Sequence, residues 1–190
     1  AARSLAELED ALRAFDGCAL KQTASNLVFG DGNPQSRVMF VGEAPGADED
    51  RIGVPFVGAA GQLLDRILAA SGLKREEVGI VNCLRCRPPG NRKPEPDEAR
   101  NCNEWLTKTL ELMKPKVLVA LGGSATKHFL GVETGITRLR GRWLELEADG
   151  HRCPALATFP PAALLRMPLN KRYVWRDLLT VQEKLEQLGT

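Results

Sequence analysis

Arg37-Val-Met-Phe-Val41 is a short apolar run that ends at Gly42, a pattern typical of a buried strand. Residues 59–70 follow with apolar side chains at helical spacing, and Val78–Asn82 is again a short strand-like run. The same alternation continues with strands expected at 116–120, 142–146 and 154–158, and helices expected at 96–113, from 123 to near 131, and at 170–188. Strands that alternate with helices predict a three-layer α/β/α sandwich around a central, mainly parallel sheet.

Length and composition set the class of protein. The chain has 190 residues, and a hydrophobic share of 43% is enough for a packed core. Neither an internal repeat nor a long linker divides it, so we expect a single domain over residues 1–190. The sequence contains no run of about 18 apolar residues, so we do not expect a membrane span. The acidic N-terminal segment does not resemble a signal peptide. We therefore expect a monomer in the cytoplasm.

Four loops follow the carboxyl ends of the predicted strands, which is where parallel sheets bind ligands: 42–58, 82–91, 122–126 and 159–168. In the first loop, four carboxylates lie within Gly42–Asp50, and Phe56 lies between glycines, where its ring can stack on a planar base. Asn82 can present a donor and an acceptor to one edge of a nucleobase. The alternatives are a solvated acidic turn, a core aromatic residue and a turn-forming asparagine.

Basic residues gather in or near the same loops, although the net charge is only +2. Three clusters can be distinguished: Arg85, Arg87, Arg92 and Lys93; Arg138, Arg140 and Arg142; and Arg166, Lys171 and Arg172. This distribution suits a track for a phosphate backbone. Gly122-Gly123-Ser124, at the start of a predicted helix, can hold one phosphate. Each cluster alone can also be a solvated surface.

Several sequence strings, taken in order, carry a resemblance. They are GEAPGADED, GVPFVGAAGQLLDRIL, CRPPGNR, RGRW and PPAALLRMP. From about Cys18 to Leu178 the chain resembles the family 4 uracil-DNA glycosylases of bacteria and archaea. The resemblance implies a four-stranded parallel sheet flanked by helices. It also implies that the substrate is uracil-containing DNA, whose deoxyuridine is extruded from the stack and hydrolysed at its N-glycosidic bond.

The resemblance also implies roles for residues of the first two loops. Phe56 would stack on the uracil, Asn82 would read its Watson–Crick edge, and the backbone at Gly42 would lie close to the base. Glu49 is our first choice, and Glu43 our second, for the carboxylate that orients water or stabilises the developing sugar cation.

DNA contacts are implied for a further set of residues. Leu164, Leu165 and Arg166 match a loop that enters the DNA groove, where apolar side chains offset the cost of unstacking. Arg87 and Ser124 are expected to contact DNA as well.

One departure from the family pattern affects catalysis. The last motif normally begins His-Pro, but here it reads Pro160-Pro161. The histidine is expected to donate a hydrogen bond to the departing uracil, and proline has no such donor. Because loss of one donor aimed at developing charge typically costs about 10²–10³ in rate, we expect weak or altered excision.

The other departure concerns the cysteines, which are five in number and therefore do not suggest a disulfide framework. The resemblance implies a [4Fe–4S] cluster held by four cysteines. Cys18, Cys86 and Cys102 match three ligand positions, and Phe15 occupies the remaining one. Cys83 is an alternative fourth ligand, or a buried thiol facing away. Whether the cluster binds is left open by the sequence.

Two other functions stay open on these grounds. One is a catalytically impaired relative that still binds DNA, since both departures remove functional groups. The other is a glycosylase for another damaged base, or an enzyme acting on free nucleosides, because an acidic pocket with an asparagine also suits those substrates.

Overall fold

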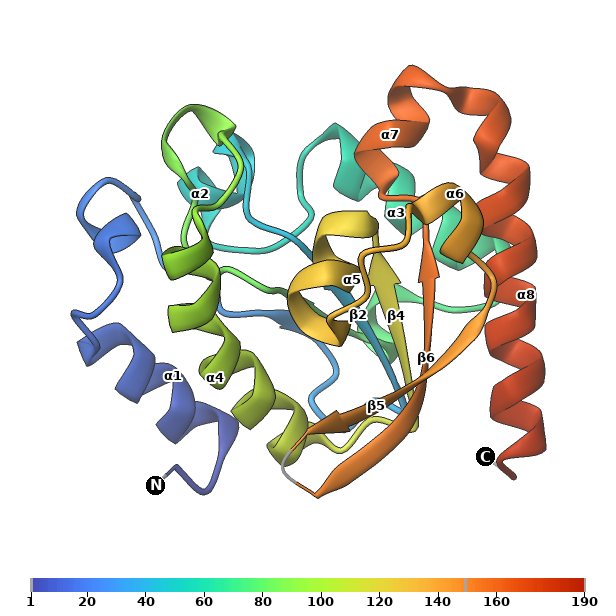
Figure 1. The fold of residues 1–190 in the computed structure, drawn as a ribbon, viewed down its shortest axis with the longest axis horizontal. Coiled ribbons are helices and arrows are strands. Elements are labelled where there is room, and N and C mark those ends of the chain that lie inside the picture. The colour runs from blue at the N-terminus through green and yellow to red at the C-terminus, as the bar shows by residue number, and fades with distance from the viewer. Residues whose placement is uncertain (1, 149, 190) are drawn as a thin grey trace.

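A mixed sheet forms the middle layer of the molecule (Figure 1). The computed structural model describes residues 2–148 and 150–189, and six strands in these ranges follow the order β1-β3-β2-β4-β6-β5. The four central strands are parallel: β3 (Gly79–Asn82), β2 (Val38–Gly42), β4 (Val117–Leu121) and β6 (His151–Thr158). Antiparallel strands β1 (Asp31–Gly32) and β5 (Trp143–Ala148) form the two edges. The mainly parallel core is confirmed, and the edge strands enlarge the four-stranded sheet that was expected.

Both faces of this sheet are covered, because alternate residues of each strand point to opposite sides. Val38 and Phe40 of β2 face one apolar cluster, and Met39 and Val41 face the other. The first cluster includes side chains of α3 (Ala59–Ala70), α7 (Pro161–Arg166) and α8 (Lys171–Gln187). The second includes side chains of α4 (Pro96–Met113), α5 (Gly123–Leu130) and α6 (Ile136–Leu139). This arrangement is the predicted three-layer sandwich.

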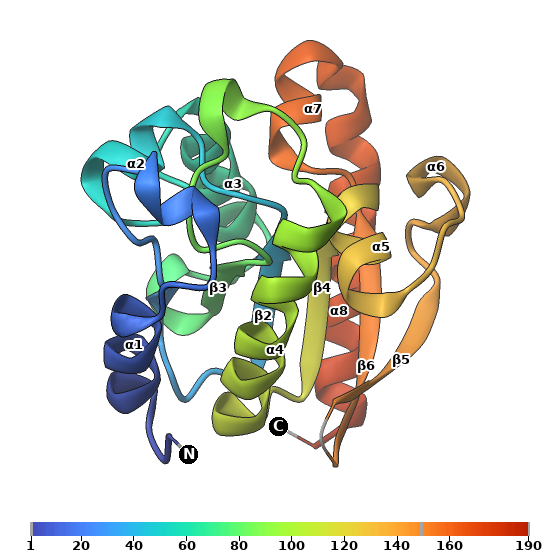
Figure 2. The ribbon, with the colours of Figure 1, turned by 60° about the vertical axis from the view of Figure 1, so that its left-hand side comes forward.

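The remaining helical segments lie outside these two layers or within loops. α1 (Leu5–Ala14) packs against α4, as Figures 1 and 2 both show. α2 (Ala47–Ile52) lies inside the acidic loop, where no helix was expected. Short 3-10 turns span Ala19–Gln22, Arg75–Glu77, Pro89–Asn91 and Pro168–Asn170.

A buried ion pair fixes α8 to the sheet. Asp177 is 1% exposed, and its carboxylate accepts hydrogen bonds from Arg140 Nη2 at 2.6 Å and from Thr158 Oγ1 at 2.6 Å. Arg140 therefore serves inside the fold and is not free for the basic track assigned to it from the sequence.

The register of the parallel strands brings the functional loops together. Gly42 of β2 and Asn82 of β3 are partners across the ladder at the carboxyl ends of the two strands. The loops that follow β4 and β6 leave from the same edge (Figure 1). Among the described residues, no helix is both long and apolar enough to cross a membrane.

Candidate active site

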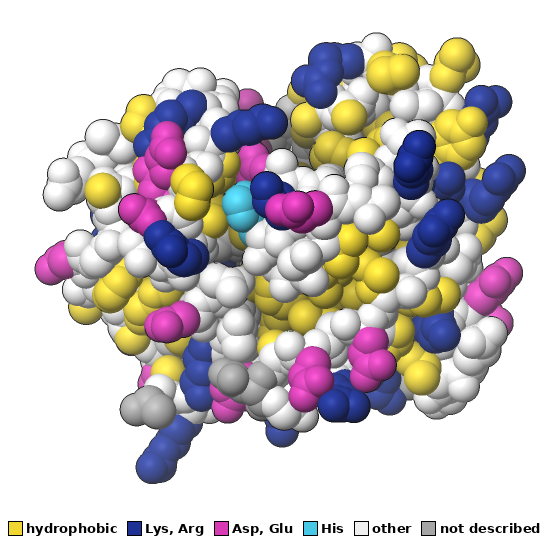
Figure 3. Space-filling view, in the orientation of Figure 1, with side chains coloured by type: hydrophobic (Ala, Val, Ile, Leu, Met, Phe, Trp, Pro, Cys, Tyr) yellow, Lys and Arg dark blue, Asp and Glu magenta, His cyan; other side chains and the backbone are white. Residues whose placement is uncertain are grey.

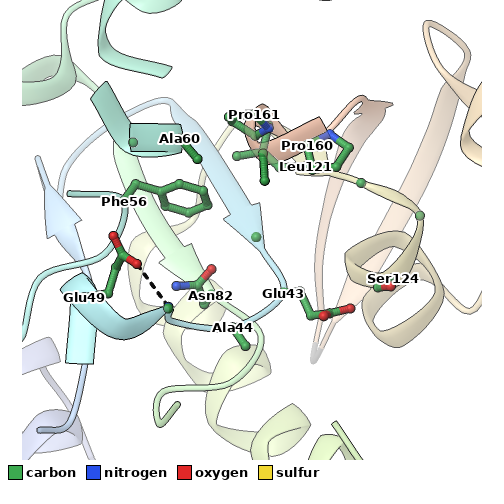
Figure 4. A pocket seen from close by; sticks show the side chains of 16 residues that line it. Glu43, Ala44, Glu49, Phe56, Ala60, Asn82, Leu121, Ser124, Pro160 and Pro161 are labelled. Carbon is green, nitrogen blue, oxygen red and sulfur yellow. Dashed lines mark hydrogen bonds between the residues drawn. The ribbon is translucent and has the colours of Figure 1, made fainter. Parts of the chain in front are cut away.

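A cavity of about 360 Å³ opens at the carboxyl edge of the sheet, and all four predicted loops contribute to it (Figure 4). Its volume is within the range of small-molecule sites. It is lined by Gly42, Glu43, Ala44, Gly46, Glu49, Phe56, Ala60, Gly61, Asn82, Leu121, Gly122, Gly123, Ser124, Pro160, Pro161 and Ala162. The candidate residues of the first two loops, Glu43, Glu49, Phe56 and Asn82, thus share one cavity.

Gly42 lines the cavity at a point where a ring and an amide meet. A Cβ atom at Gly42 would lie 2.4 Å from the Phe56 ring and 2.5 Å from Asn82 Oδ1, so only glycine leaves room for both. Asn82 is 2% exposed, and its Oδ1 has no hydrogen-bond partner in the described part of the chain. A buried acceptor left unpaired costs about 1–3 kcal/mol, so this oxygen is set to receive a donor from a ligand.

Phe56 is held in an unusual backbone conformation. Its φ of 53° lies in the left-handed region, which costs roughly 1–3 kcal/mol for such a residue. The Arg75 guanidinium donates to the carbonyl oxygen of Phe56 at 2.7 Å and also to that of Pro55. Arg75 is fixed in turn by Asp31 at 2.8 Å and Asp65 at 3.0 Å. This positioning role has no signal in the sequence, because Arg75 lies in an ordinary charged segment, 19 residues after Phe56.

Glu49 is committed to the backbone of its own loop. Its Oε1 accepts from the Gly46 N–H at 3.0 Å, and its Oε2 accepts from the N–H groups of Val57 at 2.9 Å and Gly58 at 2.7 Å. Three hydrogen bonds to one carboxylate hold together the two ends of the loop that carries Phe56. Glu49 therefore acts as a clamp as well as a lining residue.

The other three carboxylates of the acidic loop differ in whether they already have a partner. Asp50 is buried and accepts from the backbone N–H groups of Ser25 and Asn26, while Asp48 forms an exposed ion pair with Arg51. The Glu43 carboxylate has neither a hydrogen-bond nor an ion-pair partner within residues 2–148 and 150–189. Figure 4 shows it at the side of the cavity that faces Ser124. Glu43 is thus the carboxylate of the loop that remains free for chemistry.

The wall opposite Phe56 is formed by the chain after β6. Pro160 and Pro161 line the cavity, and the Pro160 ring lies against Gly122, where a Cβ atom would come within 3.2 Å of it. Proline offers neither a side-chain donor nor an N–H at this wall. The motif histidine expected from the resemblance therefore has no equivalent donor at position 160.

A second cavity, of about 530 Å³, adjoins the first and shares Glu43 and Ser124 with it. The basic residues Lys93, Arg100, Lys127 and His128 line it. The first pocket therefore opens toward a positively charged neighbour, which suits a flanking phosphate.

The helix after Pro160 exposes an apolar tip. Leu164 is 1% exposed and packs in the core, whereas Leu165 is 47%, Met167 60% and Leu169 82% exposed. Figure 3 shows hydrophobic and basic side chains next to one another over this end of the molecule. Of the three residues expected to enter a DNA groove, Leu165 and Arg166 are on the surface, and Leu164 serves the core.

The basic cluster near the Pro-rich loop is only partly on the surface. Arg87 is half-buried, and its Nε donates to Asn91 at 2.7 Å, while Arg92 forms a two-point ion pair with Glu98. Arg85 is 1% exposed and belongs to the interior. The expectation that Arg85 belongs to a surface track is wrong, because its side chain turns beneath α4 to Thr109.

Three of the four candidate cysteine ligands lie in one region of the core. The Cys102 thiol donates a hydrogen bond to the sulfur of Cys18, which lowers the pKa of Cys18 and raises that of Cys102. The backbone N–H groups of Leu20 and Arg85 also donate to these two sulfurs and favour their thiolate forms. Burial, together with the nearby Cys18, raises the pKa of Cys86 to about 11.

Cys83 and Phe15 differ from these three thiols. Burial raises the pKa of Cys83 to about 12, and the charged groups near it are Arg85 and Glu43. The Phe15 ring packs on Trp105 with 5.2 Å between centroids, so the matching fourth position is filled by an aromatic pair. Within the described residues, no three His, Cys, Asp or Glu side chains come together in a way that could hold a single metal ion.

Arg85 is the unusual charge in this region. Its Nη2 donates to Thr109 Oγ1 at 2.9 Å, but no partner for Nε or Nη1 exists among the described residues. Burial lowers the pKa of Arg85 to about 10. Because an uncompensated buried charge costs about 3–5 kcal/mol, this cation, with the thiols of Cys102 and Cys83 near it, fits a negatively charged group bound through thiolates.

The fold and the first cavity together define an α/β protein with a ligand-sized cavity at the carboxyl edge of a mainly parallel sheet. Residues 29–179 match the family model described as the uracil DNA glycosylase superfamily, and the chain belongs to that family.

Curated relatives agree with this assignment over most of their length. The chain is 45% identical over 161 residues to a type-4 uracil-DNA glycosylase of Archaeoglobus fulgidus, covering 82% of this chain and 81% of that protein. It is 40% identical over 175 residues to the type-4 enzyme of Thermotoga maritima, with 90% of each chain covered. A type-5 uracil-DNA glycosylase of Thermus thermophilus is 36% identical over 118 residues, about half of each chain. The resemblance drawn from the sequence motifs is confirmed.

Proposed function

We propose that this protein is a DNA-repair enzyme that hydrolyses the N-glycosidic bond of deoxyuridine in DNA and releases uracil. One observation carries the proposal: the Phe56 ring and the Asn82 amide meet above Gly42 in one cavity, and Asn82 Oδ1 has no donor among the described residues. Uracil presents an N3–H that this oxygen can accept, whereas cytosine has no hydrogen on N3. The names of the type-4 relatives support the same substrate.

We assign the chemical step to Glu43. With the nucleotide extruded and its base stacked on Phe56, water attacks C1′ and the C1′–N1 bond breaks with its electron pair passing to uracil N1. The Glu43 carboxylate receives the proton of the water and returns it to the uracil anion, while its charge stabilises the oxocarbenium-like transition state. Backbone N–H groups take three of the roughly four acceptor sites of the Glu49 carboxylate, and Glu49 contributes by holding the loop.

Excision is slower than in relatives with the motif histidine. As the bond breaks, negative charge develops on the uracil ring. The cavity wall formed by Pro160 and Pro161 has no side-chain donor that could stabilise this charge with a hydrogen bond. The expected loss is about 10²–10³ in rate.

DNA lies across the carboxyl edge of the sheet in this proposal. Leu165 and Arg166, at the exposed tip of α7, enter the DNA groove at the gap that the extruded base leaves in the stack. Ser124 and Arg87 contact the flanking phosphate backbone. The second, basic cavity receives a neighbouring phosphate. Affinity for DNA should then fall by about 0.9 log unit per log unit of salt for each phosphate neutralised.

We further propose that Cys18, Cys86 and Cys102 hold an iron–sulfur cluster through three thiolates. When bound, the cluster supplies a rigid inorganic cross-link between the segment of Cys18, the loop of Cys86 and α4. The soft donors and the backbone N–H groups directed at their sulfurs support this proposal.

Excision from a uracil-containing oligonucleotide, followed by alkaline cleavage at the abasic site, tests the function. Wild type should cleave, Asn82→Ala should lose most of the single-turnover rate, and Gln62→Ala, an exposed amide on α3, should match wild type. Strands with thymine or hypoxanthine serve as controls for another base.

Two results would point elsewhere. If wild type and Asn82→Ala bind DNA but are equally inert, the protein is a binding relative and the enzymatic proposal fails. Faster release of hypoxanthine than of uracil would instead assign the pocket to another base.

A further inference from the structure

Arg85 lies between two cysteines in sequence and beneath a third in space. Cys83 and Cys86 flank it in the chain, and its backbone N–H donates to the sulfur of Cys102 on α4. Its side chain reaches Thr109, seven residues after Cys102 and therefore on the same face of α4. The guanidinium also lies 5.2 Å from the centre of the Phe29 ring. A cation is thus enclosed by thiols, one hydroxyl and an aromatic face.

The described partners of this cation do not balance its charge. Nε and Nη1 have no hydrogen-bond partner in the described ranges, and the ionisable groups that act on Arg85 are the thiols of Cys102 and Cys83. Arginine remains charged even in the interior of proteins. Either the fold carries an uncompensated charge, or an anion belongs beside it.

The other cation near the cysteines is already occupied. The positive charge of Lys21 lies near Cys18 and Cys86 and favours their thiolate forms. Its Nζ, however, already donates hydrogen bonds to the carbonyl oxygens of Leu12 and Phe15, at 3.3 and 2.7 Å. Lys21 therefore caps the end of α1, and Arg85 is the cation with free donors.

We propose that Arg85 is the counter-charge of the cysteine site: its buried guanidinium, which has two N–H-bearing nitrogens without a partner among the described residues, offsets the negative charge of a cluster bound through the thiolates of Cys18, Cys86 and Cys102. This inference rests on the proposed cofactor and goes beyond it, because it makes retention of the cluster depend on a residue that is not a ligand. Because the Phe15–Trp105 pair fills the fourth position, the site offers three thiol ligands, and the buried cation lowers the electrostatic cost of their thiolate forms. Arg85 is a positioning residue of this site and takes no part in base excision.

The test compares Arg85→Met, Arg85→Lys and the neighbouring control Arg87→Met in protein purified anaerobically and reconstituted with ferrous iron and sulfide. Iron and acid-labile sulfide per chain, visible absorption and the rate of cluster loss to a chelator are measured. Arg85→Met should weaken retention about 10–100-fold, as loss of a residue that supports metal ligands typically does. Arg85→Lys, which keeps the charge, should lie between Arg85→Met and wild type, and Arg87→Met should match wild type.

Thermal unfolding provides a second measurement, because Arg85→Met should shift the unfolding temperature in opposite directions in the protein with the cluster and in the protein without it. Arg85→Met should lower the unfolding temperature of the holoprotein and raise that of the cluster-free protein, where it removes an unbalanced charge. Equal cluster retention in Arg85→Met and wild type, or a shift of the same sign in both forms, would overturn the role of Arg85 alone. Wild type without iron and sulfide after reconstitution would overturn the cofactor and this inference together, while uracil excision by that protein would leave the enzymatic proposal standing.

Discussion

The two glutamates of the base pocket differ in what their carboxylates already bind, and this difference predicts opposite behaviour for two isosteric substitutions. The Glu43 carboxylate has no partner among the described residues. Glu43→Gln should therefore change the free energy of unfolding by no more than about 0.5 kcal/mol and leave the unfolding temperature almost unchanged. It removes the proton acceptor, so the single-turnover excision rate should fall by about 10²–10⁴.

Glu49→Gln should act mainly on stability. The glutamine carbonyl can keep the two bonds from Val57 and Gly58, but its NH₂ group then faces the Gly46 N–H, which loses its acceptor. Loss of one charge-assisted hydrogen bond costs about 1.5–3 kcal/mol. For a chain of this length each kcal/mol shifts the midpoint by roughly 2–4 °C, so the expected decrease is roughly 3–12 °C.

Circular dichroism melting and single-turnover excision, run on both variants below their transitions, provide the comparison. The assignment is refuted if Glu49→Gln loses excision by a larger factor than Glu43→Gln while its unfolding temperature equals that of wild type. In that case the clamp carboxylate, and not the free one, would take part in the reaction.

Three further predictions concern the remaining parts of the site and its support. Pro160→His restores a donor to the pocket wall and should raise single-turnover excision by up to about 10²–10³; an unchanged rate would show that this donor is immaterial. Asp177→Asn leaves the half-buried Arg140 without its counter-charge and should cost up to about 3–5 kcal/mol in urea unfolding, whereas a loss below about 1 kcal/mol would contradict the structural role of this ion pair. Arg75→Met frees the carbonyl of Phe56 and should reduce excision without changing the salt dependence of DNA binding; a change in that dependence instead would place Arg75 on the DNA track.

The sequence predicted best those helices in which the apolar spacing agrees with Pro or Gly residues at the helix ends. The predicted helix 59–70 and the helix that begins at Pro96 coincide with α3 and α4, since apolar spacing and Pro or Gly mark their ends. The helix α2 was missed because its residues, Ala47–Ile52, are mostly charged and have no apolar stripe. α7 was missed because its start resembles a Pro-rich loop, and Leu164, which the resemblance assigned to the DNA groove, lies in the core.

Charged residues were the least predictable, because composition does not say whether an arginine faces water or a buried partner. Arg85 and Arg140 looked like members of surface clusters, yet one lies beneath α4 and the other pairs with Asp177. That Phe56 and Asn82 lie at one edge of the sheet was predictable, since both belong to loops that follow predicted parallel strands, and the family resemblance placed them around one base. The dependence of Phe56 on Arg75 needed coordinates, because it joins segments that share no motif.

Gly42 and Asn82 are partners in the β2–β3 ladder. In the proposed binding mode, the amide that contacts uracil and the backbone beneath the base are therefore joined by hydrogen-bonded strands and not by a loop. Selectivity for the base would then depend on the central sheet, whereas entry of the nucleotide would depend on the loops that follow the strands.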